Sequence, residues 1–500
     1  MYLLGIDIGT SFIKLSLVDA ATQKSIVTVQ YPDTENAIIS KQTGWAEQSP
    51  NTWWEQVQQG ALKLHAAASK INANYDPQSI AAIGIAYQMH GLVLVDKNQK
   101  VLRDSIIWCD SRAVEFGNKA FDTIGHEKCL AHLLNSPGNF TAAKLAWVKQ
   151  NEPAVYQQIH KIMLPGDFIA MKLTGDITTT VSALSEGIFW DFKNKEISTS
   201  VLEYFGFDAS FFPTIQEVFS HHGALQTSVA NALQLKAGIP VTYKAGDQPN
   251  NALSLNVLAP GEVAATAGTS GVIYGVGDTL SYDQQSRVNS FAHVNHTSDN
   301  NRIGMLLCIN GTGILNSWVK KMIGVNYDYN QMNQAASGIE AGSEGLKIFP
   351  FGNGAERIFE NKILGAQFSG IDLNKHTAAH IFNAAQEGIA FAFRYGLDIM
   401  RENNLQPNII RAGYANLFLS KVFSNAFVNA TGVPVALYHS DGSVGAAIGA
   451  GIGSGIYKNA AEAFSDFKPL QIIEPTKVKD YDTLYLDWKQ QLEKQLLHQQ

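Results

Sequence analysis

The sequence predicts an α/β protein built from two domains that share one plan. The chain has 500 residues, which is more than one hydrophobic core usually organises. Three short strands followed by alternating helices and strands occur twice, once beginning at Tyr2 and once at Val263. Each copy carries a Gly-Thr-Ser turn between its first two strands, which indicates an internal duplication.

The first copy begins with three segments of alternating apolar and polar residues within residues 2–31, separated by turns at 9–11 and 19–24. A period of two predicts strands, so we expect an antiparallel meander here. Ser49 followed by Pro50 is a typical helix start, and apolar residues continue that helix through Leu64. A fourth strand is expected at residues 79–87.

The second copy repeats this order of elements. Its meander is expected at residues 263–266, 272–276 and 303–309, with a helix starting near residue 313. The later elements are helices at 377–403, 420–431 and 443–453 and strands at 408–412 and 433–439. The glycine-dense segment 449–455 does not lie between a strand and the start of a helix, so we interpret it as close helix packing and not as a dinucleotide site.

The duplication divides the chain into an N-terminal domain, residues 1–246, and a C-terminal domain, residues 247–500. The hinge is expected near residue 246, with an active site in the cleft between the two domains. We expect the last helix of the chain to pack back on the N-terminal domain.

Composition excludes several classes of protein. Apolar residues make up 45% of the chain, and the net charge of −7 contains no long run of one sign, so we expect no nucleic-acid or membrane partner. The three cysteines, Cys109, Cys129 and Cys308, are too far apart for a CxxC metal site and fit a reducing cytoplasm. The N-terminus has no basic segment and the chain has no apolar span, so a soluble cytoplasmic protein is expected.

The two Gly-Thr-Ser turns are candidate phosphate-binding loops. A phosphate group can be held by main-chain N–H groups in a turn that a side chain would block, and the hydroxyl groups add donors. One such turn is usually only a hairpin, but two at equivalent places in a duplicated fold favour phosphate binding. The candidate residues are Gly9, Thr10, Ser11, Gly268, Thr269 and Ser270.

Two aspartates are candidate catalytic residues. Asp7 ends the first strand, where its carboxylate could hold Mg²⁺ through water or could stabilise its own turn. Lys14 could meet a phosphate or point to solvent. Asp247 follows the strand that ends at Gly246 and could accept the proton of a hydroxyl group that attacks a phosphate, or contribute to the metal site. From the residues alone, a helix N-cap is the favoured role of Asp247.

Six motifs occur in the order seen in the FGGY family of carbohydrate kinases, which this chain resembles over nearly its whole length. The resemblance implies a ribonuclease-H-like fold duplicated as in actin and Hsp70, with ATP and Mg²⁺ as cofactors and Asp247 as the catalytic base. The motifs are Asp7-Ile8-Gly9-Thr10-Ser11, Gln88-Met89-His90-Gly91, Trp108-Cys109-Asp110-Ser111-Arg112, Thr141-Ala142-Ala143-Lys144-Leu145-Ala146-Trp147, Gly246-Asp247 and Gly268-Thr269-Ser270-Gly271.

The Gln-Met-His-Gly stretch is similar to that of xylulokinases, whereas glycerol kinases carry Arg-Glu there. The resemblance therefore implies that Met89 and His90 contact a sugar, together with Trp108, Gln248 and Asp247. Asp110 is a further candidate contact, although with Arg112 it could equally form a structural ion pair. The implied reaction is ATP-dependent phosphorylation of D-xylulose to D-xylulose 5-phosphate, with a homodimer as the assembly common among such enzymes.

The segment 410–416 stands where the family has a Gly-Gly-Gly-Ala loop against adenine, so Gly413, Ala415 and Asn416 are candidate ATP contacts. Here Ala412 and Tyr414 replace glycines, and Asn416 replaces the usual Arg, which leaves the nucleotide pose open. Gln248 stands where many xylulokinases have Asn, which leaves the exact ketose preference open. The alternatives are an FGGY kinase for ribulose, fuculose, gluconate or glycerol, and an actin-like or Hsp70-like ATP switch.

Overall fold

The computed structural model of the protein describes residues 1–497. The N-terminal lobe is built on a five-stranded sheet with the order β13-β5-β1-β2-β3. Its first three strands form the expected antiparallel meander, and β5 and β13 continue the sheet in parallel to β1. The strands are β1 (Tyr2–Ile8), β2 (Ile13–Asp19), β3 (Ser25–Tyr31), β5 (Ile80–Tyr87) and β13 (Val241–Gly246).

The C-terminal lobe repeats this plan in a seven-stranded sheet with the order β16-β17-β15-β14-β20-β21-β22. The five strands from β17 to β21 correspond in order and direction to those of the first sheet, which confirms the duplication. The edge strands β16 and β22 were not predicted. The strands are β14 (Val263–Ala267), β15 (Gly271–Gly277), β16 (Asn289–Ala292), β17 (Ile303–Ile309), β20 (Ile410–Gly413), β21 (Val435–Tyr438) and β22 (Gln471–Ile473).

Helices and short strands complete the N-terminal lobe. The helix predicted at Ser49-Pro50 begins at Pro50, although the Ser49 side chain makes no capping hydrogen bond. The helices are α1 (Pro50–Ile71), α2 (Val114–Ile124), α3 (His126–Leu133), α4 (Thr141–Asn151), α5 (Pro153–Tyr156), α6 (Pro165–Thr174), α7 (Val181–Glu186), α8 (Thr199–Phe205), α9 (Thr227–Leu233) and α10 (Asp247–Ser254). The short strands are β4 (Glu47–Gln48), β6 (Val93–Val95), β7 (Ser105–Ile106), β8 (Lys161–Met163), β9 (Thr178–Thr180), β10 (Trp190–Asp191), β11 (Glu196–Ile197) and β12 (Thr214–Gln216).

The later part of the chain supplies seven more helices and a small hairpin. They are α11 (Gly313–Met322), α12 (Tyr329–Ala336), α13 (Ala378–Glu402), α14 (Lys421–Thr431), α15 (Gly442–Gly453), α16 (Ala460–Ala463) and α17 (Val478–Leu497), with β18 (Lys347–Phe349) and β19 (Gln367–Ser369). The predicted helices at 377–403, 420–431 and 443–453 are thus confirmed within one residue at each end.

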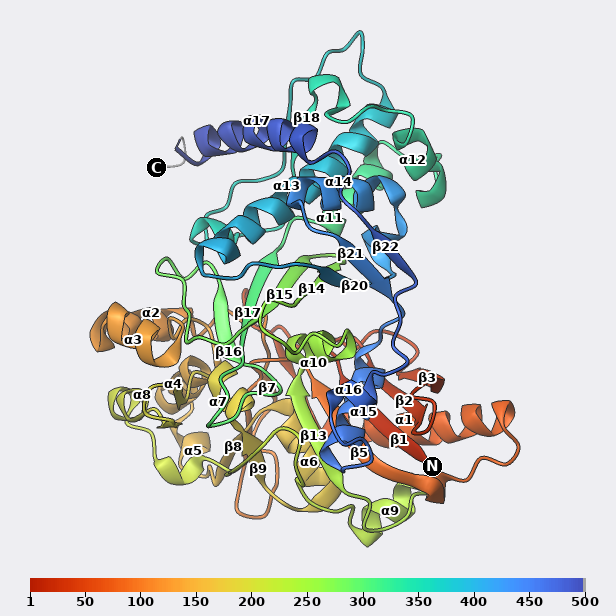
Figure 1. The fold of residues 1–500 in the computed structure, drawn as a ribbon. Helices are drawn as coiled ribbons and strands as arrows, with labels where there is room; N and C mark the ends of the chain where they lie inside the picture. Colours follow the sequence, from red (N-terminus) through yellow and green to blue (C-terminus); the bar gives the residue numbers. More distant parts are fainter. Residues whose placement is uncertain (498–500) are drawn as a thin grey trace.

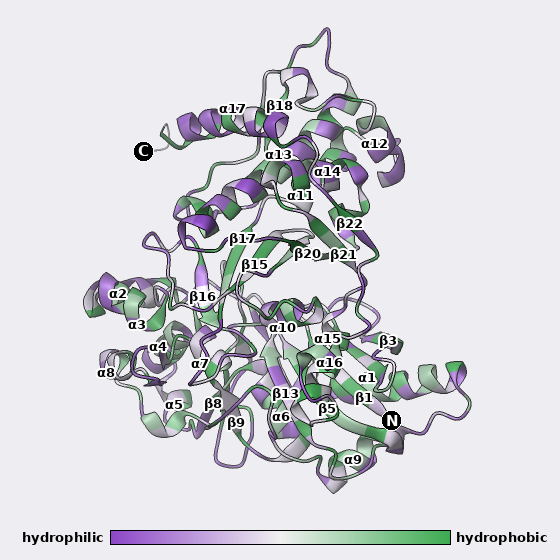
Figure 2. Ribbon diagram, in the orientation of Figure 1, coloured by the Kyte–Doolittle hydropathy of each residue, from purple (hydrophilic) through white to green (hydrophobic). Residues whose placement is uncertain are grey.

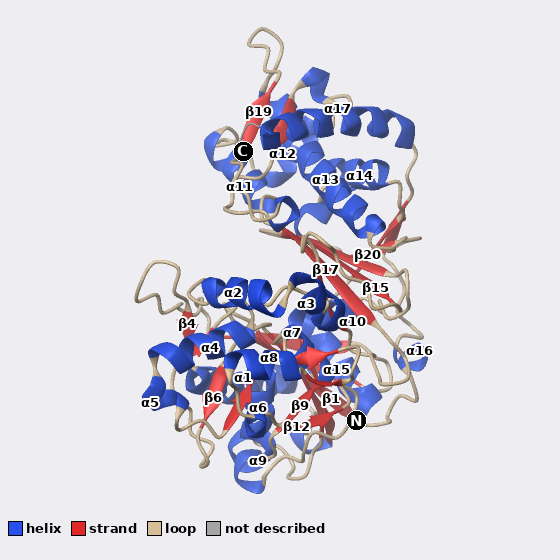
Figure 3. Ribbon diagram, turned by 90° about the vertical axis from the view of Figure 1, so that its left-hand side faces the viewer, coloured by secondary structure: helices blue, strands red, loops and turns tan. Residues whose placement is uncertain are grey.

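The two lobes lie one above the other, with α10 between them in two views (Figures 1 and 3). The strands of both central sheets are largely apolar (Figure 2). One buried cluster lies within each lobe, and a third joins residues of the C-terminal sheet, such as Tyr274 and Phe291, with residues of the N-terminal lobe, such as Met89. Within residues 1–497, none of the helices combines the length and the apolar character needed to cross a membrane.

Helix α15 belongs to the C-terminal half of the sequence but packs on the sheet of the N-terminal lobe, against β1, β5 and β13 (Figure 1). Glycines make this close approach feasible. A Cβ atom on Gly5 would lie 1.8 Å from the Ser443 carbonyl oxygen, and one on Gly84 would lie 1.9 Å from that of Ala446. On the helix itself, a Cβ atom on Gly453 would lie 1.9 Å from the Thr242 carbonyl oxygen, so the glycine-dense segment does serve helix packing.

The last helix does not pack as expected. α17 contacts α13 and α14 of the C-terminal lobe, where Tyr485, Trp488 and Leu492 are buried in that lobe's core. The expectation that it returns to the N-terminal domain is therefore wrong, because its apolar face is already covered by these two helices.

Candidate active site

Both Gly-Thr-Ser turns lie at the ends of the first strands of the two sheets. In the first turn the Gly9 N–H donates to the Phe12 carbonyl oxygen (3.1 Å), so the main chain itself closes the turn. The second turn is joined to the start of α11, because the N–H groups of Gly313 and Ile314 donate to the carbonyl oxygens of Gly268 and Thr269 (both 3.0 Å). These hydrogen bonds fix each turn without using the N–H groups of Thr10 and Ser11 in the first turn or of Thr269 and Ser270 in the second.

Asp7 stands directly before the first turn and lies close to the start of α15. A Cβ atom on Gly442 would lie 2.5 Å from Asp7 Oδ2. Burial, and then the negative charge of Asp441, raise the pKa of Asp7 to about 6. The ammonium group of Lys14 lies 3.5 Å from Asp441 Oδ2, so Lys14 faces a carboxylate at this site.

Asp247 is the first residue of α10. The N-cap position is occupied by Gly246, which has no side chain to cap the helix, so the N-cap interpretation of Asp247 is wrong. Burial, and then the charge of Asp7, raise the pKa of Asp247 to about 7. A carboxyl group that titrates near neutrality suits a general base, since it is both available and basic enough to take a proton.

The charge of Asp7 raises the pKa of Asp247, and a divalent cation between the two carboxyl groups would relieve this repulsion. Within residues 1–497, no group of three or more His, Cys, Asp or Glu side chains is arranged as a set of direct metal ligands. A cation at this site would thus need water and ligand oxygens to complete its coordination, as is usual for Mg²⁺.

Met89 and His90 form the turn after β5. His90 has a φ of 63°, in the left-handed region that non-glycine residues rarely adopt. The Lys144 ammonium group donates to the His90 carbonyl oxygen (2.8 Å), and His90 Nδ1 lies 3.0 Å from the Glu186 carbonyl oxygen. Because a carbonyl oxygen only accepts, Nδ1 carries the proton. Burial lowers the pKa of His90 to about 3, which leaves the other ring nitrogen as a free acceptor.

Gly246 brings these residues next to Asp247. A Cβ atom on Gly246 would lie 2.6 Å from Met89 Cγ and 3.3 Å from Glu186 Oε2, so a larger residue would collide with the Met89 side chain. The Glu186 carboxyl group is buried, and burial raises its pKa well above the usual range. The arrangement places a neutral imidazole, a thioether and two carboxyl groups together.

Trp108 contacts the first turn. Its ring is 52% exposed, and its Nε1 donates to Thr10 Oγ1 (2.9 Å). An exposed indole beside polar groups is a typical surface for the apolar face of a sugar.

Sequence comparison identifies the family. The N-terminal domain of the FGGY family of carbohydrate kinases matches residues 2–254, and its C-terminal domain matches residues 263–454. The chain belongs to the FGGY family of carbohydrate kinases. The xylulose kinase of Haemophilus influenzae is 29% identical over 417 residues, which is 82% of each chain. The enzyme is thus a sugar kinase, and the alternative of an ATP switch without this activity falls.

Solved structures agree on the fold of this FGGY kinase. The xylulose kinase of Rhodospirillum rubrum is 24% identical, with a TM-score of 0.89 and 99% of both chains covered. The glycerol kinase of Plasmodium falciparum with ADP is 19% identical, with a TM-score of 0.89, and covers 99% of this chain and 98% of its own. These likenesses support the two-lobed, actin-like architecture with a duplicated ribonuclease-H-like fold.

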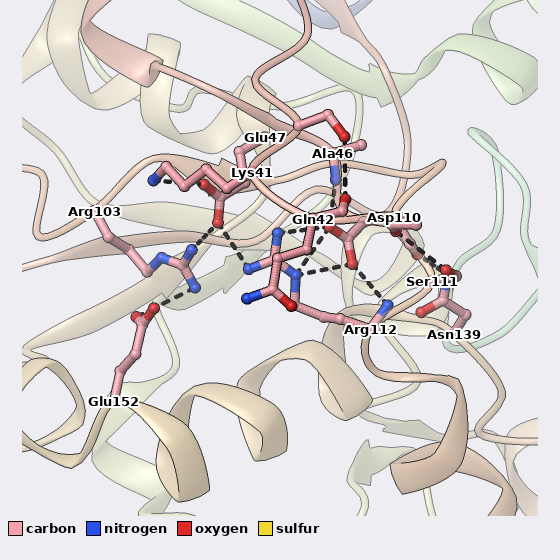
Figure 4. Close-up of polar contacts among 12 residues, drawn as sticks. Lys41, Gln42, Ala46, Glu47, Arg103, Asp110, Ser111, Arg112, Asn139 and Glu152 are labelled. Carbon is pink, nitrogen blue, oxygen red and sulfur yellow. Dashed lines mark hydrogen bonds and ion pairs between the residues drawn. The ribbon is translucent and has the colours of Figure 1, made fainter.

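Asp110 of this FGGY kinase is not free to bind a sugar. It is fully buried, and its carboxylate accepts hydrogen bonds from the Ala46 N–H and from the Arg112 guanidinium (2.7 to 3.0 Å), as Figure 4 shows. Arg112 also donates to Glu47 (2.8 Å) and lies over the ring of Trp45 at 3.8 Å. Asp110 therefore forms the structural ion pair with Arg112, and its prediction as a substrate contact is wrong.

The segment that stands in place of the adenine loop approaches the second turn. The Asn416 amide nitrogen would lie 3.6 Å from a Cβ atom on Gly268, and Asn416 has a φ of 53°. The Tyr414 N–H donates to the Tyr438 carbonyl oxygen (2.7 Å), which anchors the segment to the end of β21. Gly413 and Ala415 flank this anchor.

Three acidic residues of this FGGY kinase were not among the candidates. Asp441 caps α15 through the Ser443 N–H (2.9 Å) and faces Lys14, and its Asp-Gly-Ser sequence before a helix is the signal that could have found it. Glu356 accepts hydrogen bonds from the N–H groups of Asn310 and Gly311 (both 2.9 Å), which lead into α11. Glu186 carries no sequence signal, because only the fold brings it to Gly246.

Proposed function

We propose that this FGGY kinase transfers the γ-phosphoryl group of ATP, with Mg²⁺, to D-xylulose and forms D-xylulose 5-phosphate. The observation that carries the proposal is the grouping of Met89, His90 and Asp247 around Gly246, beside the first Gly-Thr-Ser turn. The names of curated relatives at 26 to 29% identity, which are xylulose kinases, support the same sugar.

In this proposal Asp247 accepts the proton of the terminal hydroxyl group of the sugar while the hydroxyl oxygen attacks the phosphorus atom. His90, neutral and with a free acceptor nitrogen, orients the sugar through a hydroxyl group, and Trp108 and Gln248 bound the pocket. ATP supplies the phosphoryl group, and Mg²⁺ neutralises the charge that its phosphates carry. Asp7 and Asp247 would hold the cation through water.

The nucleotide would be held by residues of both lobes. The N–H groups of the two turns are suited to the phosphate oxygens, and Lys14 adds a positive charge beside the first turn. The remaining contacts would come from the segment beside the second turn. The proposed nucleotide contacts are Gly9, Thr10, Ser11, Lys14, Gly268, Thr269, Ser270, Gly413, Ala415 and Asn416.

An ADP-release assay with ATP and Mg²⁺ tests the substrate. D-xylulose, D-ribulose, L-ribulose, L-fuculose, glycerol and gluconate are each supplied over a range of concentrations. The proposal expects the highest kcat/KM with D-xylulose. A higher value with any other compound would overturn the assignment of the sugar and of Met89 and His90 as its determinants, while the enzyme class would stand.

A further inference from the structure

Three side chains around the first Gly-Thr-Ser turn form a closed ring of hydrogen bonds. Thr10 Oγ1 donates to Gln88 Oε1 (3.3 Å), Gln88 Nε2 donates to Gln48 Oε1 (3.0 Å), and Gln48 Nε2 donates to the Thr10 carbonyl oxygen (2.8 Å). Gln48 and Gln88 are 4% and 1% exposed, so water does not compete for these amide groups. A buried and fully paired polar network of this kind holds its members in one arrangement.

The ring uses the one proton that the hydroxyl group of Thr10 can donate. This oxygen donates its proton to Gln88 and accepts the indole N–H of Trp108 (2.9 Å). The hydroxyl group therefore has a positioning role, and the phosphate contacts of this turn fall to main-chain N–H groups and Ser11. The sequence predicted that both the hydroxyl group and the main chain of Thr10 bind phosphate, whereas the structure leaves only its main-chain N–H for that contact.

The ring also joins the two halves of the reaction site. Gln88 directly precedes Met89 and His90, and Thr10 lies in the candidate phosphate loop. Gln48 ends β4, which pairs with the short strand β7, and its amide oxygen also accepts the Trp53 indole N–H (3.2 Å). Gln48 thus holds both Thr10 and Gln88 in place through hydrogen bonds.

We propose that Gln48 is a positioning residue for phosphoryl transfer, which acts through Thr10 and Gln88 to fix the phosphate loop against the turn that carries Met89 and His90. The inference rests on the carbohydrate kinase activity of the family and not on the choice of sugar. Since a displacement of about 1 Å between reacting groups can reduce a rate about 100-fold, the loss should appear in kcat.

The substitution Gln48→Glu isolates this contact. It keeps the oxygen that accepts from Gln88 and Trp53, but removes the N–H that reaches Thr10 and sets a carboxylate against its carbonyl oxygen. We expect kcat to fall about 10- to 100-fold, with the KM for sugar within about threefold of the parent value. The matched control is Asn429→Asp, because this buried amide also donates to a carbonyl oxygen, that of Asn425 (2.8 Å), but lies in the other lobe.

Two further measurements separate positioning from a general loss of stability. Gln88→Met opens the ring at another point, and the double variant should lose no more activity than the worse single variant. In the nucleotide-free protein, hydrogen exchange of the amides in residues 9–12 should become about tenfold faster in Gln48→Glu and stay unchanged in Asn429→Asp.

A kcat for Gln48→Glu within twofold of the parent, or additive losses in the double variant, would overturn the proposal. Unchanged exchange at residues 9–12 would overturn it as well, and this readout needs no substrate. The kinetic variants are assayed with whichever sugar the parent enzyme phosphorylates, so a substrate other than D-xylulose changes the proposed function and leaves this test intact.

Discussion

The substitution Asp247→Asn should lower the activity and raise the stability of the enzyme. The pKa of Asp247 is raised from 3.8 to about 7, a difference of about 3 units that corresponds to about 4 kcal/mol of destabilisation when the group is ionised. The folded state binds this proton more tightly than the unfolded chain, so the penalty is absent below pH 4, grows as the pH rises and is complete above pH 7. Because Asp247 keeps some solvent contact, we expect about 2 kcal/mol at pH 8.

The assay is urea unfolding of the nucleotide-free enzyme in EDTA at pH 5 and pH 8, followed by circular dichroism. Asp247→Asn should be about 2 kcal/mol more stable than the parent at pH 8, less so at pH 5, and its turnover should fall by about 10² to 10⁴. An equal difference at both pH values, or a less stable variant at pH 8, would refute the reasoning.

The control for this experiment is Asp283→Asn. Against the opposing effect of burial, hydrogen bonds from Arg287 hold the pKa of Asp283 below its ordinary value. A lowered pKa contributes stability above the unfolded value, so this variant should be less stable than the parent at both pH 5 and pH 8. The two aspartates should therefore respond with opposite sign.

Three other perturbations have defined outcomes. The kcat/KM for sugar should fall tenfold for each pH unit below about pH 7, because Asp247 gains its proton there. A higher Mg²⁺ concentration should move this decrease to lower pH, which pH profiles at two Mg²⁺ concentrations check. Gly84→Ala should cost about 3 kcal/mol or more in urea unfolding by pushing on the Ala446 carbonyl, whereas Gly277→Ala should be tolerated; equal losses would contradict this. Arg112→Lys should cost about 3 to 5 kcal/mol, because the buried carboxylate of Asp110 loses its bidentate partner and that of Glu47 loses one hydrogen bond; a thermal midpoint within 2 °C of the parent would contradict this.

The seven-residue strands were predictable because each is long enough to show its pattern, and the four-residue strands β20 and β21 because each lies between predicted helices. β1, β2 and β17 have seven residues each, and their apolar and polar positions or bounding turns mark them in the sequence. β16 and β22 have only four and three residues, and their strand character comes from pairing with β17 and β21. Such edge strands form because the adjacent strand has free main-chain hydrogen-bonding groups, and the local sequence gives no sign of this.

The residues of the candidate site also divide into those that the sequence could predict and those that it could not. Asp7 and Asp247 were predictable because Asp7 lies near the end of a buried strand and Asp247 directly follows one, and the charge of Asp7 raises the pKa of Asp247. Asp110 was misassigned because Ala46, which donates to its carboxylate, and Glu47, which shares Arg112 with it, lie more than 60 residues away in the chain. Gln48 and Glu186 likewise gain their surroundings from tertiary packing alone.

The placement of α15 governs how the lobes can move. The chain passes between the lobes three times, after α10, before α15 and after α16, since β14, β21 and β22 belong to the upper sheet while α10, α15 and α16 lie below it (Figure 1). Three covalent connections beside the α10–α15 contact would resist twisting and sideways sliding far more than bending. The lobes should therefore open and close by rotation about a single hinge axis. Asp7 and Asp441 should stay together on the same side of that hinge throughout the motion.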